Sequence, residues 1–331
     1  MRWRTGSYEV IKTRHSPPKK TNSKGADLRR KPEGEGGGRQ GYRIPKEDNV
    51  RAIQRERRFV CGRSRQSAMY QEVEIYTCSA DPAGRRRDRG MSERPPFRGK
   101  NPETWEKHNA AAARKFFVRL VNTNFGQDDL HTTLTYADET LPGDDRQAER
   151  DVSNFLRHLR AECKKQGFDP PEAIIVTEHQ DEDPAQGKKA VRYHHHVLLR
   201  CDLGRDDVER CWHRKGESLG YANCDRLKLD KSSLEALASY LMKSPNRKHR
   251  WRRTRGIRDP IRPRPNDSRY TRRAIQRIAT GPDLHSPEFW ARKYPGWELN
   301  EAEANYNDFW GWSITLKLRR RPERGKDGRG H

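Results

Sequence analysis

The amino-acid sequence predicts an α+β fold in which helices pack on a central antiparallel sheet. Two observations lead to this prediction. Between about residues 102 and 246, a first helical pattern is followed by segments in the order β-α-β-β-α-β-α. The connections between successive strands suit antiparallel pairing with helices on one face of the sheet, as in ferredoxin-like and RRM-like folds.

Each element follows from its own apolar pattern. An alanine-rich run and the four apolar residues after it predict a first helix that contains residues 110–121. After that helix, the predicted elements are a strand at 131–136, a helix at 144–166, strands at 173–178 and 192–200, a helix at 206–215, a strand at 223–229 and a helix at 232–244. The clearest helical stripe is made by Val152, Phe155, Leu156, Leu159 and Cys163.

The last of these helices carries signals for both of its ends. Ser232 and Glu235 have the spacing of a capping box, in which the two side chains bond backbone amides at a helix start. Pro245 is expected to stop the helix. Further along the chain, residues 310–316 predict one last strand before a basic tail.

Charge and apolar content divide the chain into three parts. Residues 1–100 carry 26 basic and 12 acidic side chains among many glycines and prolines, which predicts a basic, disordered arm with one short strand at 68–78. Residues 101–246 carry 22 basic and 25 acidic side chains and are expected to form the folded core. Residues 247–331 are expected to form a basic extension with helices and the last strand.

The formal net charge of +23 favours a polyanionic partner. The densest basic runs are rich in arginine, whose guanidinium group binds phosphate through paired hydrogen bonds and stacks on bases. We therefore expect the chain to bind nucleic acid. The residues predicted to contact DNA lie in one run just after the core, namely Arg250, Trp251, Arg252, Arg253 and Arg255.

Composition also argues against a membrane or secreted protein. No stretch approaches the roughly 20 apolar residues of a membrane span, and residues 1–5 lack the apolar block of a signal peptide. The six cysteines include no CxxC pair, so neither a zinc ribbon nor a redox motif is predicted. We expect free thiols and a cytoplasmic location.

Three consecutive histidines lie in the predicted strand at 192–200. Side chains alternate along a strand, so His194 and His196 are expected on one face, about 7 Å apart along the strand, with His195 on the other. Glu178, at the end of the preceding strand, can join them if the two strands pair in register. Two imidazoles and a carboxylate suit Mn²⁺, tolerate Mg²⁺ and would also accept zinc or cobalt.

A tyrosine and a lysine share one face of the last core helix. Tyr240 and Lys243 are three residues apart, beside the leucine stripe of that helix. A phenol is a weak nucleophile, but it can attack a phosphate that a nearby divalent ion polarises. Lys243 could then neutralise charge on the phosphate. Tyr240 and Lys243 are therefore the candidate catalytic residues.

These motifs, taken in order, resemble those of the HUH endonucleases. They are Thr133-Leu134-Thr135-Tyr136, Glu178, the His194/His196 pair and Tyr240-x-x-Lys243. The pattern is most similar to single-tyrosine initiators of rolling-circle replication in small plasmids and phages, including replication-associated proteins of the filamentous-phage gene II kind. The resemblance covers roughly residues 100–320 and makes residues 101–246 the expected nuclease core.

The resemblance implies a specific chemistry. The tyrosine would cut one DNA strand, remain bound to the 5′-phosphate and leave a 3′-hydroxyl that primes synthesis, and the reverse step would reseal the strand. Position 244 is serine, so the two-tyrosine variant of the family is not expected. The chain has no GxxxxGK[ST] motif, so a host helicase is expected to unwind the DNA and a host polymerase to extend the primer.

Two alternatives remain open at the level of sequence. A relaxase or a transposase would use the same chemistry for plasmid mobilisation or transposition. A non-catalytic basic protein with an RRM-like sheet would bind single-stranded nucleic acid without cutting it, with stacking from aromatic residues such as Trp251.

Overall fold

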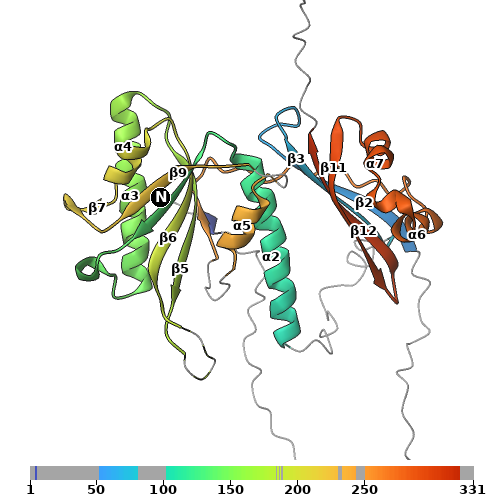
Figure 1. Cartoon of the computed structure of the whole chain (residues 1–331), viewed down its shortest axis with the longest axis horizontal. Coiled ribbons are helices and arrows are strands. Elements are labelled where there is room, and N and C mark those ends of the chain that lie inside the picture. The colour runs from blue at the N-terminus through green and yellow to red at the C-terminus, as the bar shows by residue number, and fades with distance from the viewer. Residues whose placement is uncertain are drawn as a thin grey trace, which may run out of the picture.

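The computed structural model is described for residues 4–5, 52–80, 102–183, 185, 187, 189–229, 233–243 and 250–320. These residues form two larger antiparallel sheets and one two-stranded sheet, with helices packed on and between the larger two (Figure 1). The predicted α+β class is therefore confirmed. None of the helices in this part of the chain is long and apolar enough to cross a membrane.

The first sheet has six strands in the order β1-β10-β5-β6-β4-β9, and all neighbours are antiparallel. Its strands are β1 (Arg4–Thr5), β4 (Leu130–Thr135), β5 (Glu172–Gln180), β6 (Val191–Arg200), β9 (Ala222–Arg226) and β10 (Arg252–Arg253). The four longer strands are those that the sequence predicted in this region. β6 lies at the centre, between β5 and β4, so the three histidines occupy an interior strand.

Helices cover both faces of this sheet rather than one. Ile175 and Val197 point into a core shared with α3 (Asp145–Gln166), whose predicted apolar stripe is fully buried there. Ile174 and Leu198 point the other way, into a core with α2 (Pro102–Asn124) and α5 (Glu235–Leu241). The expectation of helices on one face was wrong because consecutive residues of β5 and β6 are apolar, and both faces of such strands need cover.

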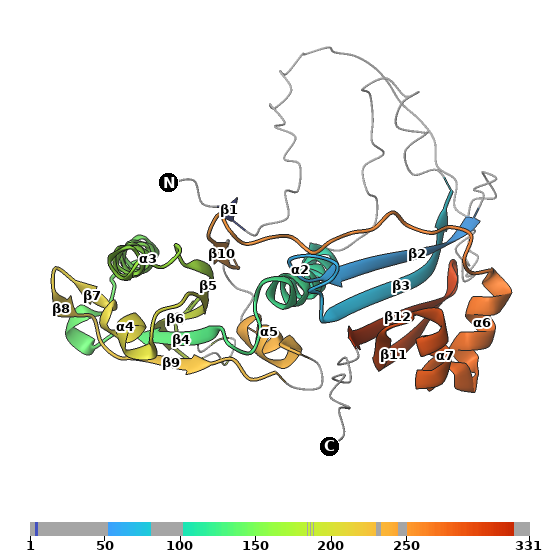
Figure 2. The same ribbon diagram turned by 90° about the horizontal axis from the view of Figure 1, so that it is seen from above.

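A second sheet joins residues from both ends of the described chain. Its strand order is β11-β12-β3-β2. The strands are β2 (Ala52–Cys61), β3 (Tyr70–Ser79), β11 (Trp297–Asn307) and β12 (Gly311–Arg320). One face packs on α6 (Arg272–Thr280), η3 (Pro282–His285) and α7 (Pro287–Lys293), while α2 lies between the two sheets (Figure 2).

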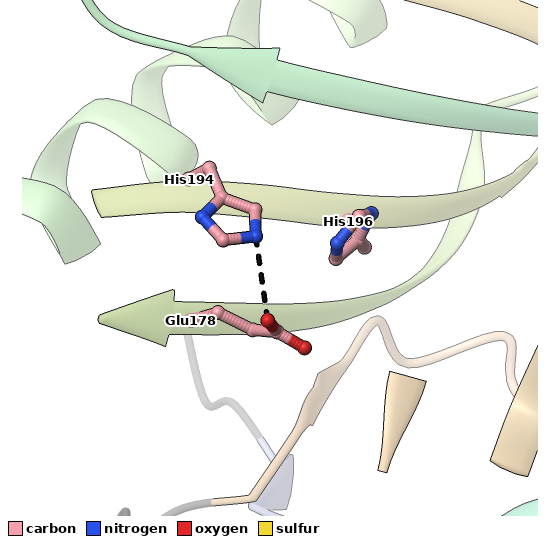
Figure 3. A group of neighbouring side chains, drawn as sticks. All are labelled: Glu178, His194 and His196. Carbon is pink, nitrogen blue, oxygen red and sulfur yellow. Dashed lines mark ion pairs between the residues drawn. The ribbon is translucent and has the colours of Figure 1, made fainter. Parts of the chain in front are cut away.

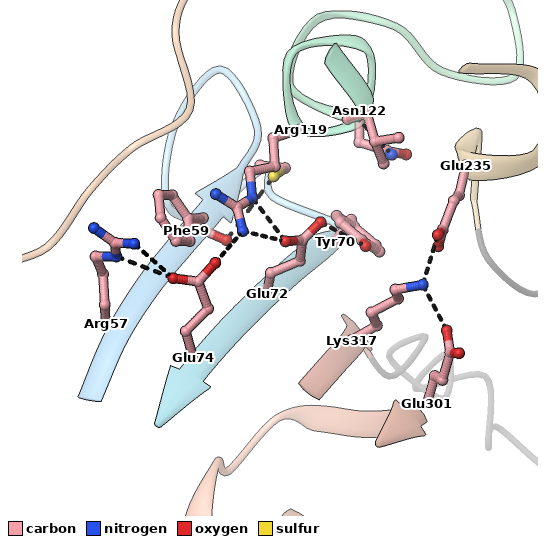
Figure 4. A network of polar contacts seen from close by, with 12 residues as sticks. Arg57, Phe59, Tyr70, Glu72, Glu74, Arg119, Asn122, Glu235, Glu301 and Lys317 are labelled. Carbon is pink, nitrogen blue, oxygen red and sulfur yellow. Dashed lines mark hydrogen bonds and ion pairs between the residues drawn. The ribbon is translucent and has the colours of Figure 1, made fainter. Parts of the chain in front are cut away.

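Residues 52–79 therefore differ from the basic arm and single short strand that the sequence predicted. Their strands read as hydrophilic because the face toward α2 carries charged side chains, and these pair with one another (Figure 4). Arg119 of α2 donates to Glu72 and to Glu74, each at 2.7 Å, and Arg57 donates to Glu74 at 2.8 Å. The rest of the predicted arm lies outside the described residues, and the proposed three-part division of the chain stays a prediction.

The helix that carries the tyrosine is shorter than predicted. α5 spans Glu235–Leu241, and Ser232 and Pro245, its predicted cap and stop, lie outside the described residues. Glu235 serves as an ion-pair partner instead, since its carboxylate lies 2.5 Å from the Lys317 ammonium of β12. The Leu234 amide at the helix start donates to the Asn122 side chain at 3.1 Å. Contacts with α2 and with the second sheet thus fix the start of α5.

The helix predicted at 206–215 is also shorter. α4 (Arg205–Arg210) ends early, and the chain continues into a small hairpin of β7 (His213–Arg214) and β8 (Glu217–Ser218). A further short helical turn, η1 (Asp138–Thr140), follows β4.

Candidate metal centre

Strand register brings Glu178, His194 and His196 onto one face of the first sheet. Glu178 of β5 is directly opposite His194 of β6, and Val176 is opposite His196. Opposed residues of an antiparallel pair point to the same side, and residues two apart on a strand share a face. One potential ligand atom from each of the three residues lies within 4.8 Å of the others (Figure 3).

His194 is held in the tautomer that suits a metal ligand. Its Nδ1 lies 2.9 Å from the Arg192 carbonyl oxygen, which can only accept, so Nδ1 carries the proton. Nε2 lies 3.4 Å from Glu178 Oε2. The hydrogen bond to Glu178 raises the pKa of His194 despite burial, and the same bond lowers the pKa of Glu178. The pair therefore holds its carboxylate ionised, as a cation ligand must be.

His196 presents an unbonded nitrogen in a buried position. Its Nδ1 lies 3.2 Å from His131 Nε2 and 3.4 Å from Thr133 Oγ1, whereas its Nε2 is buried and makes no hydrogen bond. Burial, together with the nearby His131 and His194, lowers the pKa of His196 to about 4. The ring is therefore neutral near pH 7, with a lone pair available.

These observations fit a divalent cation. A buried polar atom without a partner is costly, and a metal bound at His196 Nε2 would satisfy it. The donor set of two imidazoles and one carboxylate matches the preference of Mn²⁺ and accommodates Mg²⁺. Glu178, His194 and His196 are the residues that could hold it.

Tyr240 and Lys243 lie beside this cluster. The Tyr240 ring is edge-on to the His196 ring, with centroids 6.0 Å apart, and 57% of the tyrosine is exposed. Lys243 lies just beyond the end of α5, but its amide still donates to the Tyr240 carbonyl at 3.0 Å, so the helical turn continues to it. Its positive charge is near enough to contribute to the lowered pKa of Glu178. The five predicted residues from β5, β6 and α5 are thus neighbours.

His195 points into the opposite core, as strand alternation predicts. It is fully buried, with Nε2 2.9 Å from the Tyr136 hydroxyl and Nδ1 2.9 Å from Thr177 Oγ1. Its ring also packs edge-on against Trp212. The middle histidine therefore belongs to the framework that fixes β6, and not to the cluster.

The prediction that Trp251 contacts DNA was wrong. Only 1% of its surface is exposed, and its ring packs on Phe116 and Phe117 of α2, with centroid distances of 6.2 and 5.1 Å. Trp251 therefore fills space between the first sheet and α2, where no base can reach it. An aromatic residue within a basic run signals core packing here because the run includes strand β10.

The four arginines of that run differ in their surroundings. Arg252 donates to Ser153 at 3.1 Å, and burial lowers its pKa, while Arg253 is paired with Asp259 at 2.5 Å. Arg250 donates to the Asn109 carbonyl at 3.1 Å. Arg255 is exposed. Of the predicted DNA contacts, Arg255 stays a prediction for an open surface, whereas Arg252 and Arg253 hold protein partners.

Sequence analysis missed two residues that support His196. His131 and Thr133 lie on β4, on the face that carries His194 and His196, because Thr133 is opposite His196 and Thr135 is opposite His194. The His131 and His196 rings stack with centroids 5.3 Å apart. The alternation of His131 and Thr133 in the first predicted strand was a usable signal, but only once the β4–β6 register was known.

The fold and this cluster define an α+β protein with a candidate divalent-metal site next to an exposed tyrosine. Residues 129–245 match a family of replication-associated proteins, the one named for ORF2 and the gene II protein. The match covers about a third of the chain, contains all five clustered residues and leaves out α2 and the second sheet. It associates this segment with DNA replication. Comparison with curated proteins and with solved structures gives no match.

Proposed function

We propose that the chain is a metal-dependent DNA endonuclease and strand transferase of the HUH type. It would nick and rejoin one DNA strand through a 5′-phosphotyrosine intermediate and so start rolling-circle replication of a plasmid or phage. The observation that carries this proposal is the exposed Tyr240 ring 6.0 Å from that of His196, within a segment that matches replication-associated proteins.

The roles of the metal-facing residues follow from their chemistry. Glu178, His194 and His196 would hold Mn²⁺ or Mg²⁺, and the ion supplies a Lewis acid that polarises a phosphoryl oxygen. The Arg192 carbonyl orients the His194 ring, and His131 and Thr133 orient that of His196. These supporting contacts keep the ligand nitrogens in place as DNA enters.

Tyr240 is the proposed nucleophile. Its phenol oxygen forms a bond to phosphorus while the bond between phosphorus and the 3′ oxygen of the preceding nucleotide breaks. The phenol proton passes to solvent, and the departing 3′ oxygen takes a proton from solvent. Lys243 places its positive charge beside the phosphate, and attack by a returning 3′-hydroxyl reverses the step and frees Tyr240.

The proposed partners follow from this chemistry. The substrate is single-stranded DNA at an origin, and a host helicase and polymerase would open and extend it. Relaxase or transposase activity would use the same residues and differ in the DNA that is joined. The buried position of Trp251 removes the stacking residue on which a purely binding role was expected to depend.

Trapping the covalent intermediate tests the proposal. The full chain is incubated with Mn²⁺ or Mg²⁺ and labelled single-stranded oligonucleotides tiled across its neighbouring non-coding DNA, and the products are run on a denaturing gel. We expect a protein–DNA band that Tyr240→Phe abolishes while oligonucleotide binding persists. Tyr306→Phe is the matched control, because Tyr306 is a similarly exposed tyrosine, 60% accessible, on the second sheet. Binding without any adduct would favour the non-catalytic alternative, and an unchanged adduct in Tyr240→Phe would identify another nucleophile.

A further inference from the structure

The face of the first sheet that carries the metal cluster continues across β4 onto β9. Thr133 is opposite His196 on one side and Asn223 on the other. The pairing of β4 with β9 extends beyond the strand proper, since the Thr135 amide donates to the Tyr221 carbonyl at 2.8 Å. Tyr221 is therefore opposite Thr135, which is itself opposite His194.

A single row of side chains thus crosses four strands. It runs Glu178, His194, Thr135, Tyr221, and opposed residues point to the same side of the sheet. Adjacent strands are about 4.8 Å apart, which places Tyr221 roughly 10 Å from His194 across the sheet. The tyrosine therefore lies on the metal-bearing face, beside the cluster rather than within it.

Glycine at position 220 permits this placement. Gly220 has φ = +144°, and a Cβ there would lie 2.5 Å from the Ala137 amide nitrogen and 2.6 Å from the Thr135 carbonyl oxygen. Any side chain would push the start of β9 away from the end of β4. The close approach at Gly220 keeps Tyr221 in the row.

Tyr221 is poorly explained by packing within the chain. It is 72% exposed, more than Tyr240, and it belongs to none of the apolar clusters formed by the described residues. Its neighbours Leu219 and Ala222 pack against the α3 side of the sheet. The acidic group further along this face, Asp225, is paired with Arg205 at 3.1 Å.

We infer that Tyr221 is a base-stacking subsite for the nucleotide next to the phosphate that Tyr240 attacks. An exposed aromatic ring on a sheet face binds single strands by stacking on a base, and every base offers a π-face. The position of this subsite relative to the cut rests on the proposed function. Stacking of single-stranded DNA on Tyr221 does not, and it can be measured without cleavage.

The test measures binding in the non-cleaving Tyr240→Phe full chain. Fluorescence anisotropy follows a labelled oligothymidylate and, where the gel assay finds a cleaved oligonucleotide, that oligonucleotide. We expect Tyr221→Ala to weaken binding of each about tenfold, and Tyr221→Trp to retain it. Tyr306→Ala is the matched control and should bind as the parent does.

Abasic substitutions then locate the stacked base. Removing the base at one position next to the cleaved bond should weaken binding to the parent but not further weaken Tyr221→Ala, whereas losses at distant positions should add. The inference is overturned if Tyr221→Ala binds like Tyr306→Ala, or if its loss adds to base removal at every position. If no oligonucleotide is cleaved while Tyr221→Ala still weakens oligothymidylate binding, the nuclease proposal fails and the stacking surface stands.

Discussion

Tyr240 and His196 lie edge to face at 6.0 Å although one comes from α5 and the other from the central strand β6. Their proximity depends on how α5 is anchored. Asn122 of α2 binds the amide at the helix start, and Lys317 of β12 binds Glu235 in the first turn. A nucleophile and a metal ligand on separate elements can be uncoupled by changes that touch neither, which makes the arrangement open to mutation.

The three histidines should separate into two classes. His194→Ala and His196→Ala should abolish the rise in melting temperature that Mn²⁺ produces, because each removes a proposed ligand. His195→Ala should keep that rise but lower the free energy of unfolding by about 1–3 kcal/mol, since Tyr136 and Thr177 lose a buried partner. Thermal unfolding with and without Mn²⁺ measures both effects. Equal loss of the Mn²⁺ response in all three variants would contradict the strand-face assignment.

Lys243→Ala should slow adduct formation without abolishing it. The lysine is exposed, and its charge acts on the site from the end of α5, so we expect a loss of about ten- to a hundredfold in the single-turnover rate. Lys243→Arg keeps the charge and should keep most of the rate. A rate unchanged in Lys243→Ala would remove the lysine from the catalytic residues.

Lys317 should act on the rate of cutting from the second sheet. Its ammonium bridges Glu235 at 2.5 Å and Glu301 at 2.6 Å, so Lys317→Met should loosen the start of α5 and lower the single-turnover rate more than DNA affinity. Arg277→Met removes an ion pair of similar length, that with Asp283 at 2.7 Å, far from α5 and serves as control. Lys317→Arg should restore the rate. Parallel losses of affinity and rate in Lys317→Met would point to general unfolding instead.

Stability should fall in acid partly through Glu74. Burial alone would raise the pKa of Glu74, but the charges and hydrogen bonds of Arg119 and Arg57 lower it below its usual range. A carboxylate whose pKa is lower in the folded than in the unfolded chain stabilises the fold above the unfolded pKa, and this contribution is lost as pH falls through the folded value. Denaturant unfolding from pH 7 downward should therefore show a steeper loss below about pH 4 in the parent than in Glu74→Gln. Identical pH profiles would exclude this role.

Trp251 and Arg255 should separate packing from DNA contact. Trp251→Ala should cost about 3–5 kcal/mol of unfolding free energy because it empties a buried site against Phe116 and Phe117. Arg255→Ala should leave stability near that of the parent and reduce the slope of log affinity against log salt by about 0.7. An unchanged slope would place the DNA path elsewhere.

The sequence predicted the first sheet and its cluster well because local periodicity and strand alternation carry that information. The apolar stripe of α3 and the placement of His194 and His196 opposite to His195 both depend on residues close in the chain. Tyr240 also met the cluster as expected.

The second sheet escaped prediction because its strands are amphipathic in an unusual way. Glu72, Glu74 and Arg57 are charged yet face α2, where the partner of both carboxylates, Arg119, comes from a distant part of the chain. Composition therefore suggested solvent where pairing provides burial. Trp251 was misjudged for the converse reason, since its charged neighbours hid a core position.

The position of α2 between the two sheets has a consequence for how the chain can be divided. One surface of this helix completes the core beneath the proposed active site, and Arg119 on another surface neutralises two carboxylates of the second sheet (Figure 4). A fragment limited to residues 129–245 would keep every clustered side chain and lack the wall on which α5 rests. The smallest working unit therefore extends well past the segment that family likeness outlines, and an excised version would need a replacement for that helix.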